Sequence, residues 1–253
     1  EEDLKLDRET GTLIRNNGTG EINSMDKYAL EIALRAKEQF GGSVTAISMG
    51  PDSSKGSLRY AFSVGADEGY LLSDRALGGA DAYATAKTLG AAVRKLENEK
   101  GPFDLILCGK NSSDGDTFLV PPSFAENLNI PHSTGVVDYI LSEKSIEVKR
   151  EIEDGFEHVE LPLPALLSVS KTVFPARFPN VRLRLAANRK EIPVFAAADL
   201  PVDLNDVGSK GSLTTVGGSF VPEHSKNCQM LHGSTDEESA NMLVGALSKK
   251  ALI

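Results

Sequence analysis

"LILCGKNSSDGDTFLVPPSFAENL", residues 105–128, carries three structural signals in succession. A short apolar run ends at Gly109, a polar loop with small residues follows, and a helix-like segment closes the stretch. This order of strand, small-residue loop and helix is typical of α/β proteins that hold a phosphate group at the end of a strand. Four residues are unexpected in such a loop, since acids repel phosphate and prolines have no N–H to donate: Asp114, Asp116, Pro121 and Pro122. A nucleotide loop, an altered nucleotide loop and a simple turn therefore remain open interpretations.

The two prolines predict where the helix begins. If it began at Thr117, both prolines would lie in its interior, where a proline is costly. A helix that begins near Pro121 accepts that residue at its first position. We therefore expect a loop from Gly109 to about Val120, with any phosphate-binding N–H groups supplied by residues 115–120. Asp114 and Asp116 would turn this loop by bonding their own backbone, and Gly115 would provide a positive φ.

Upstream of this stretch, apolar strands alternate with amphipathic helices. The predicted order is helix 26–40, strand 43–49, helix 53–65, strand 69–73, helix 79–99 and strand 103–109. Such alternation predicts the α/β class, with a doubly wound, mostly parallel, Rossmann-like sheet and helices on both faces. Ligands of these sheets bind at the carboxyl ends of the strands, which here are residues 49–51, 73–75 and 109–120.

The pattern changes after residue 134. Residues 145–152 and 156–161 alternate with period two around the turn Asp154-Gly155 and predict an antiparallel hairpin, and 164–170 predicts a buried strand. The basic run 171–190 is either a solvated surface or a docking or anion-holding segment. Residues 196–233 lack periodicity, and a helix is expected from about residue 236. We therefore expect a nucleotide-binding α/β domain over 1–195 and, over 196–253, an extended arm with a helix that packs on a partner subunit.

Composition narrows the function. The 253 residues carry a net charge of −9, which argues against nucleic-acid binding, and no apolar run is long enough to span a membrane. Without a basic, apolar leader or a cysteine pair, the sequence favours a reduced, cytoplasmic setting. The scattered histidines predict no metal site, and no catalytic residues stand at a recognisable spacing. A stand-alone dehydrogenase is disfavoured because no G-x-G-x-x-G follows a strand.

Several motifs together resemble one family, the β subunits of electron transfer flavoproteins. They are "TGTLIR" (10–15), "SMGP" (48–51), "GAD" (65–67), "LLSDRALGGADAYAT" (71–85), "CGKNSSDGDT" (108–117) and "VKREIEDGFEHVELPLPALLS" (148–168). The segment "GSKGSLTTV" (208–216) resembles the arm of anaerobic, NADH-linked members.

The resemblance implies an electron-carrier subunit without a self-contained active site, so whether the chain counts as an enzyme stays open. It would pair with an α subunit that carries an FAD and would hold a second nucleotide itself, either AMP or a second FAD. The complex would exchange electrons with an acyl-CoA dehydrogenase-like flavoenzyme. In electron-bifurcating members, electrons from NADH part toward ferredoxin or flavodoxin and toward the α-side FAD. The strings at 10–15 and 71–85 favour this bifurcating, FAD-binding type.

The resemblance also transfers positions of the nucleotide site. They are Asn23, Met49, Gly50, Asp81, Thr85, Gly109, Lys110, Asn111, Asp114, Gly115, Asp116, Thr117 and Val120. The alternative is structural: Asn23 and Asp81 would only cap helices, and Met49 would only belong to the core. For partner docking, the resemblance implies a loop near residues 169–180 with Val173 or Phe174 as its apolar anchor and Arg177 beside it.

The chain departs from the family pattern in two places. The family opens with a strand and a loop before the region that matches residues 10–15, and Glu1 already lies past both, so we expect the sheet to lack an internal strand. At residues 118–122 the family usually has a small residue, Gln, Val, Gly and Pro, whereas this chain has Phe, Leu, Val, Pro and Pro, so the Gln is lost and the Gly is a Pro. These departures leave a second hypothesis open, a nucleotide-binding interaction subunit without a redox role.

Overall fold

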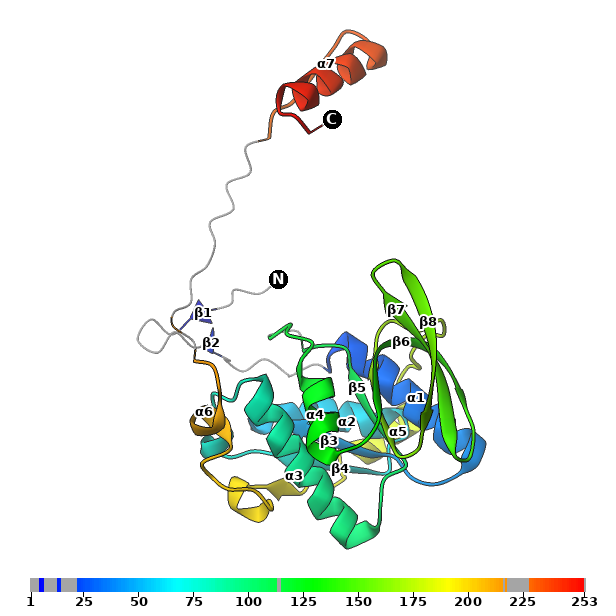
Figure 1. Cartoon of the computed structure of the whole chain (residues 1–253), viewed down its shortest axis with the longest axis vertical. Helices are drawn as coiled ribbons and strands as arrows, with labels where there is room; N and C mark the ends of the chain where they lie inside the picture. The colour runs from blue at the N-terminus through cyan, green and yellow to red at the C-terminus, as the bar shows by residue number, and fades with distance from the viewer. Residues whose placement is uncertain are drawn as a thin grey trace.

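The alternation of helices and strands continues from residue 24 to residue 128. We describe a computed structural model, which covers residues 22–112, 115–215, 217 and 228–252, and only the backbone of 5–6 and 13–14. The elements of this part are α1 (Ser24–Phe40), β3 (Thr45–Met49), α2 (Lys55–Val64), β4 (Glu68–Leu72), α3 (Ala82–Lys100), β5 (Leu105–Gly109) and α4 (Val120–Leu128). Two short 3-10 helices, Asp52–Ser54 and Arg75–Leu77, follow β3 and β4. All six predicted elements between residues 26 and 109 are confirmed, with ends within about three residues (Figure 1).

Local chemistry accounts for the ends of these helices. The carboxylate of Asp81 accepts a hydrogen bond from the backbone N–H of Ala84 and so caps the start of α3. At the end of α1, Gly41 has a φ of 81°, a conformation that glycine adopts without strain. The α4 helix begins at Val120 with prolines in its first turn, as predicted, rather than at Thr117.

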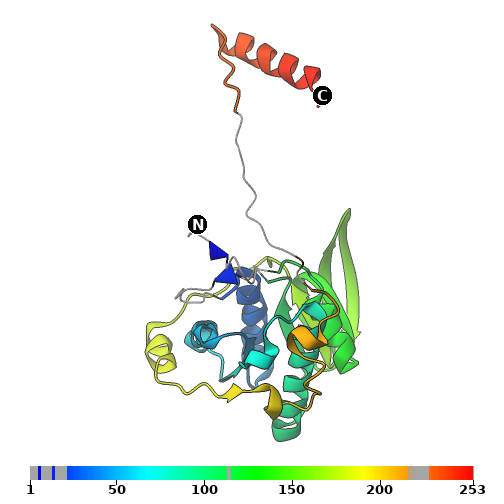
Figure 2. The same ribbon diagram turned by 90° about the vertical axis from the view of Figure 1, so that its left-hand side faces the viewer.

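Downstream, the chain adds four strands to the sheet. Its strands are β6 (His132–Leu141), β7 (Ser145–Ile152), β8 (Gly155–Pro162) and β9 (Ala165–Val169). β9 lies between β5 and β6 and is parallel to both, whereas β6, β7 and β8 are antiparallel neighbours. The predicted hairpin and buried strand are confirmed; the hairpin β7–β8 projects from the body (Figures 1 and 2). β6 was not predicted.

The parallel sheet is divided in two. One part has the order β10-β4-β3, where β10 is Val194–Phe195, and the other has the order β5-β9-β6-β7-β8. Among the described residues, β3 and β5 pair with no strand on the sides that face each other, so each is an edge strand. In the doubly wound order, the first strand of the fold lies between the strands that β3 and β5 represent. Among the described residues no strand occupies this internal position, as expected from the sequence.

Helices α1 and α3 cover the space between the two half-sheets. Leu34 of α1 packs with Val44 next to β3, while Ile32, half a turn away, packs with Leu105 of β5. On α3, Leu89 contributes to clusters that contain strand residues from both halves. The space is therefore an apolar groove enclosed by helices, and we call it the β3–β5 groove. It belongs to a cavity of about 2470 Å³ that continues to the carboxyl ends of the strands.

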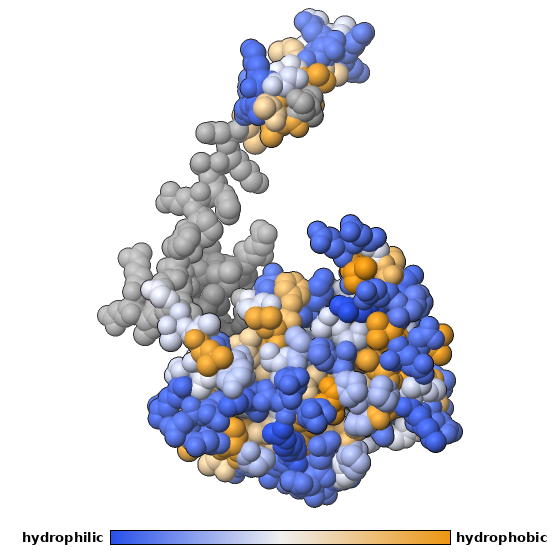
Figure 3. Space-filling model, in the orientation of Figure 1, coloured by the Kyte–Doolittle hydropathy of each residue, from blue (hydrophilic) through white to orange (hydrophobic). Residues whose placement is uncertain are grey.

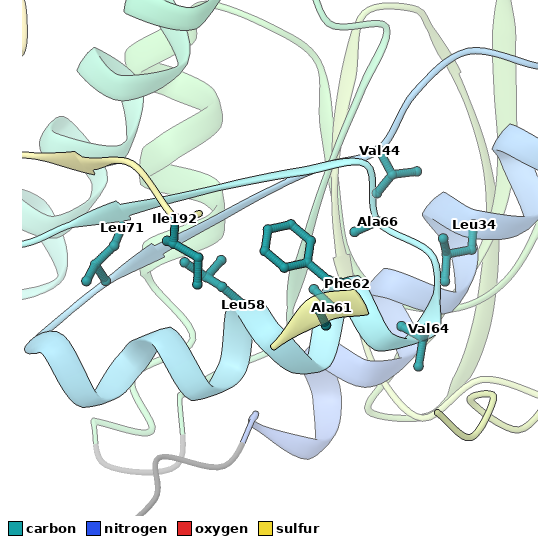
Figure 4. Close-up of a cluster of buried hydrophobic side chains, with 10 residues drawn as sticks. Leu34, Val44, Leu58, Ala61, Phe62, Val64, Ala66, Leu71 and Ile192 are labelled. Carbon is teal, nitrogen blue, oxygen red and sulfur yellow. The ribbon is translucent and has the colours of Figure 1, made fainter. Parts of the chain in front are cut away.

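The core under β3 and β4 shows how tightly helix and sheet pack. Leu58 and Phe62 of α2 lie beside Leu71 of β4 and Ile192 (Figure 4). A Cβ atom at Gly69 would come within 2.8 Å of the Phe62 ring, so only glycine allows this ring to rest on the strand. α2 is thereby held against the half-sheet that contributes Met49 and Gly50 to the cavity.

The C-terminal part contains α5 (Val181–Ala187), a 3-10 helix (Ala197–Asp199), α6 (Gly208–Gly211) and α7 (Asp236–Lys249), while β1 (Lys5–Leu6) and β2 (Leu13–Ile14) form a short antiparallel pair near the N-terminus. Part of the segment expected as an extended arm packs on the body instead, since Ala197, Leu200 and Val207 are buried beside Leu72. The predicted final helix is confirmed as α7, which has no buried residues and lies apart from the α/β body (Figures 1 and 2). The division into two domains at residue 195 stays a prediction.

Candidate functional site

The cavity opens where the carboxyl ends of three parallel strands meet. Ten of the thirteen predicted site positions line it: Asn23, Met49, Gly50, Asp81, Thr85, Gly109, Asn111, Gly115, Thr117 and Val120. Lys110 and Asp116 lie in the same loop but do not line the cavity, and Asp114 is outside the described residues. Positions separated by almost a hundred residues in sequence are thus brought together, as expected for a ligand site of this sheet type.

The start of α1 is bound directly to the end of β5. Asp26 accepts a hydrogen bond from the backbone N–H of Gly109 at 2.6 Å, and the amide of Asn23 donates to the carbonyl of Asn111 at 2.7 Å. Asn23 makes no side-chain cap on α1, so its amide serves to hold the loop rather than the helix end. The two bonds fix the first residues of the loop at the rim of the cavity. The sequence did not predict this role of Asp26, which depends on a contact with Gly109 over eighty residues away.

Burial raises the pKa values of two groups beneath the loop. It raises the pKa of the Asp26 carboxyl, and the hydrogen bonds from Gly109 and Asn23 offset this only in part. Burial, and after it the nearby charge of Asp26, raises the pKa of the Cys108 thiol to about 12. Cys108 is therefore a protonated thiol at neutral pH and is unsuited to act as a nucleophile.

The loop from Gly109 to Leu119 turns in a different way from that predicted. Gly115 does not have a positive φ; that conformation occurs at Asp116 (44°) and Phe118 (59°) instead. The Asp116 carboxylate accepts a hydrogen bond from the side-chain amide of Asn111, so this carboxylate has a hydrogen-bond partner within the loop. The expectation that this acid bonds its own backbone was wrong in detail, because a side-chain partner lies five residues upstream.

The loop leaves backbone donors at the cavity. Pro121 and Pro122 have no N–H, so the first turn of α4 offers few donors. Within the described part of the chain, the N–H groups of Thr117, Phe118 and Val120 have no hydrogen-bond acceptor, and all three residues line the cavity. Unused N–H groups beside a helix start are suited to hold an anion such as a phosphate. They lie within the range 115–120 from which such donors were expected.

The segment around Asp81 forms the opposite wall. The Asp81 carboxylate accepts hydrogen bonds from the N–H groups of Leu213 (2.8 Å) and Thr214 (3.0 Å), in addition to Ala84. Burial works against its charge, but the donors of Ala84, Thr214 and Leu213 outweigh burial and hold its pKa below the ordinary value. Asp81 thus caps α3, as the structural alternative had it, and also anchors the chain that leads into the arm. Thr85 lies one turn further along α3.

The positions predicted for partner docking have unequal roles. Val173 is 72% exposed, but Phe174 is half-buried and packs edge-on against Tyr139 with ring centroids 6.0 Å apart. Arg177 is engaged in ion pairs with Glu31 and Glu38. Phe178, which the sequence did not single out, is 92% exposed. Only the structure shows that this aromatic ring has so little contact with its own chain, and such exposure is the signal of a docking residue.

Helix α5 extends the same surface. Val181 and Leu185 are exposed on it, and the basic side chains of Arg182 and Arg184 are exposed beside them. Residues 173–185 thus contain the exposed apolar residues Val173, Phe178, Val181 and Leu185 and the exposed basic residues Arg182 and Arg184; we call this set the apolar surface around Phe178. We call the segment 171–180 the docking loop.

Two further observations concern the whole described chain. No helix in it is both long and apolar enough to cross a lipid bilayer. Nor do its His, Cys, Asp and Glu side chains form a group of three that could hold a metal ion.

Comparison with known proteins agrees with this arrangement. Residues 10–200 match the family described as the electron transfer flavoprotein domain. The chain is 40% identical over 242 residues to the electron transfer flavoprotein subunit beta of Thermoanaerobacterium thermosaccharolyticum, covering 95% of this chain and 91% of that protein. It is 37% identical to subunit CarD of the caffeyl-CoA reductase-Etf complex of Acetobacterium woodii (99% and 95% covered). It is 38% identical to the acryloyl-CoA reductase electron transfer subunit gamma of Anaerotignum propionicum (96% and 92% covered).

Proposed function

The chain belongs to the electron transfer flavoprotein family as a homologue of its β subunits, and from this premise we propose that it binds FAD at the cavity and passes electrons between flavins in a cytoplasmic heterodimer with an α subunit. The partner flavoenzyme is acyl-CoA dehydrogenase-like, and NADH supplies electrons that part toward ferredoxin or flavodoxin and toward an FAD on the α subunit. The observation that carries the proposal is the set of cavity-lining N–H groups of Thr117, Phe118 and Val120, which have no acceptor among the described residues.

The residues at the cavity fit a dinucleotide. Thr117, Phe118 and Val120 offer backbone donors to a phosphate, while the glycine ends of β3 and β5 let a ligand approach the backbone closely. A flavin, when bound, supplies the electron-transfer chemistry, so the protein itself needs no acid, base or nucleophile. The chain's own residues position the cofactor and limit its contact with water. The protonated Cys108 and the internally bonded Asp81 and Asp116 agree with such a role.

The names of two relatives support an electron-transfer complex with an acyl-CoA-directed enzyme. One is a subunit of a caffeyl-CoA reductase-Etf complex and another an electron transfer subunit of acryloyl-CoA reductase. By analogy, we propose an acyl-CoA-directed partner for this chain. The cavity volume of about 2470 Å³, which includes the β3–β5 groove, exceeds the roughly 300–1,000 Å³ of small-molecule sites.

Nucleotide content is the decisive measurement. We expect the heterodimer, purified with its α subunit, to release two FAD molecules on denaturation, identified by chromatography and absorbance. Release of one FAD and one AMP would contradict the bifurcating type. The chain would then be a simple electron-carrier subunit whose own site holds AMP. A heterodimer whose β site releases no nucleotide would favour the interaction subunit without a redox role, which the unusual residues 118–122 motivate.

We further propose that the apolar surface around Phe178 docks the flavoenzyme partner. Its exposed apolar residues fit an apolar pocket, and the basic side chains of Arg182 and Arg184 fit an acidic rim around that pocket. Phe178 thereby takes the anchor role that the sequence had assigned to Val173 or Phe174, since Phe174 is packed against Tyr139.

Truncation of this side chain gives a direct test. We expect Phe178→Ala to raise the dehydrogenase concentration needed for half-maximal electron transfer by roughly 5- to 30-fold, as loss of an aromatic anchor typically does. Stability should change little because the ring is almost fully exposed. Steady-state electron transfer at varied dehydrogenase concentration measures the effect, with Phe156→Ala on hairpin β7–β8, another exposed phenylalanine, as the matched control. Equal behaviour of both variants would exclude Phe178 as the anchor.

The helix α7 is proposed to contact the α subunit. Its apolar residues Met242, Leu243 and Val244 are exposed next to polar ones (Figure 3). A helix whose apolar side chains find no cover on its own body is suited to pack on another chain.

A further inference from the structure

The docking loop is held on its inner side and free on its outer side. The Thr172 hydroxyl donates to the carbonyl of Phe174 at 2.7 Å, and the Phe174 ring packs beneath the guanidinium of Arg35, 4.2 Å from its centroid. At the other end, the N–H of Asn180 donates to the carbonyl of Ser63. The loop is therefore attached to α1 through Phe174 and to α2 through Asn180, and Phe178 lies between these two points.

The strongest of these attachments is an ionic cluster centred on Glu31. This carboxylate lies on α1 and is only 3% exposed. It accepts three hydrogen bonds from Arg177: from Nε at 2.8 Å, from a terminal nitrogen at 3.1 Å and from the backbone N–H at 3.1 Å. Arg35 donates a fourth at 2.7 Å, and Arg177 also pairs with the exposed Glu38. Both the side chain and the backbone of Arg177 are thus set by one buried carboxylate.

A buried charge is a costly way to hold a loop. Removing a carboxylate from water is unfavourable unless hydrogen-bonded partners compensate, and apolar packing often stabilises equally well. Burial alone would raise the pKa of Glu31, but the bonds from Arg177 and Arg35 prevail and hold the pKa below its ordinary value. The ionic cluster fixes the orientation of the Arg177 side chain, which apolar packing does not, because the planar guanidinium accepts one orientation against a carboxylate.

The residue after this fixed point is Phe178. Since the backbone N–H of Arg177 and its guanidinium are both bound, the chain leaves Arg177 in a defined direction, and its carbonyl is further contacted by the Tyr60 hydroxyl at 3.4 Å. The next residues reach Asn180, whose side chain caps α5. We propose that Glu31 is a positioning residue for partner docking: it orients Arg177 so that the docking loop presents Phe178 to the flavoenzyme in one conformation. The inference rests on the proposed docking role of Phe178.

The test uses the intact heterodimer with an acyl-CoA dehydrogenase that reduces it in the presence of its acyl-CoA substrate. Glu31→Gln keeps the shape of the side chain and removes its charge. We expect the dehydrogenase concentration at half-maximal rate to rise about 5- to 10-fold, because the docking-competent loop becomes a smaller fraction of the population. The maximal rate and the nucleotide content should stay unchanged. Arg177→Lys, which keeps the charge but not the planar fork, should give an intermediate increase.

A matched control is Glu157→Gln, which removes a carboxylate from an exposed pair with Arg150 at 3.5 Å and should have no effect. Amide hydrogen exchange of residues 177–180 provides a second readout and should accelerate in Glu31→Gln while exchange in the strands does not. In the double variant Glu31→Gln/Phe178→Ala, the half-maximal concentration should be no higher than in Phe178→Ala alone.

The outcomes separate the two proposals. If Phe178→Ala weakens docking and Glu31→Gln does not, Glu31 has no positioning role, although docking at Phe178 stands. If Phe178→Ala itself has no effect, the docking assignment fails and the inference fails with it. If Glu31→Gln is too unstable to assemble, Arg177→Lys must still raise the half-maximal concentration, and an unchanged value there overturns the inference.

Discussion

A version of this chain extended at its N-terminus by an apolar five-residue strand on a flexible linker is expected to unfold at a temperature roughly 5–15 °C higher than the original chain. The reason is the β3–β5 groove. Two parallel edge strands of five residues each, Thr45–Met49 and Leu105–Gly109, face it, and α1 and α3 enclose it. A strand placed there gains backbone hydrogen bonds on both sides and buries its side chains against two helices.

The position also suits the chain direction. An added strand followed by α1 and β3 would form a right-handed βαβ unit, the handedness that such units almost always have. Each buried aliphatic side chain contributes about 1.5–3 kcal/mol, and ordering each residue costs about 1–2 kcal/mol, so the net gain is a few kcal/mol.

The control for this prediction is an extension of the same length with prolines at alternate positions, which cannot donate to either edge. Thermal unfolding gives the stability difference, and amide exchange should slow in β3 and β5 only with the first extension. If the chain with the apolar extension behaves like the chain with the proline-bearing extension, the groove does not accept a strand.

The sequence predicted those parts of the fold that depend on local pattern. Strands β3, β4, β5 and β9 are short apolar runs between glycines and prolines, and the position of Pro121 limited where α4 could begin. β6 escaped prediction because it pairs parallel to β9 and antiparallel to β7 with irregular register, so its burial follows no simple alternation.

The candidate site was predictable in position but not in its internal bonds. The strand ends were located because parallel strands bring them together. That Asp26 binds Gly109 and that Asp81 holds Leu213 depends on contacts between segments far apart in the sequence. For the same reason the sequence indicated a docking segment and named Val173 or Phe174 as its anchor, whereas only three-dimensional packing shows that Phe174 rests against Tyr139 and that Phe178 is exposed.

The second large effect is expected at Gly109. A Cβ atom there would lie 2.8 Å from the backbone nitrogen of Asp26 and 2.8 Å from its carboxylate, closer than real Cβ contacts. Because the nitrogen belongs to the backbone of α1, it cannot rotate away. Gly109→Ala must therefore separate the end of β5 from the start of α1, and it disturbs the bonds from Gly109 to Asp26 and from Asn23 to Asn111.

We expect Gly109→Ala to lower nucleotide affinity at the cavity roughly 5- to 140-fold, since overpacking of this kind costs about 1–3 kcal/mol and falls on the loop that bears the N–H donors. FAD and AMP retained by the purified heterodimer, and their rebinding after removal, provide the measurement. Asn23→Ala removes the 2.7 Å bond to the loop without overpacking and should give a smaller loss. Gly90→Ala in α3 is the matched control, because a Cβ there would make only ordinary contacts, at 3.5 Å with Asn127 and 3.9 Å with Leu128, and Gly90 does not line the cavity. If Gly109→Ala retained its circular dichroism spectrum and its nucleotide, the phosphate could not be held by residues 115–120, because this substitution displaces the loop that carries them.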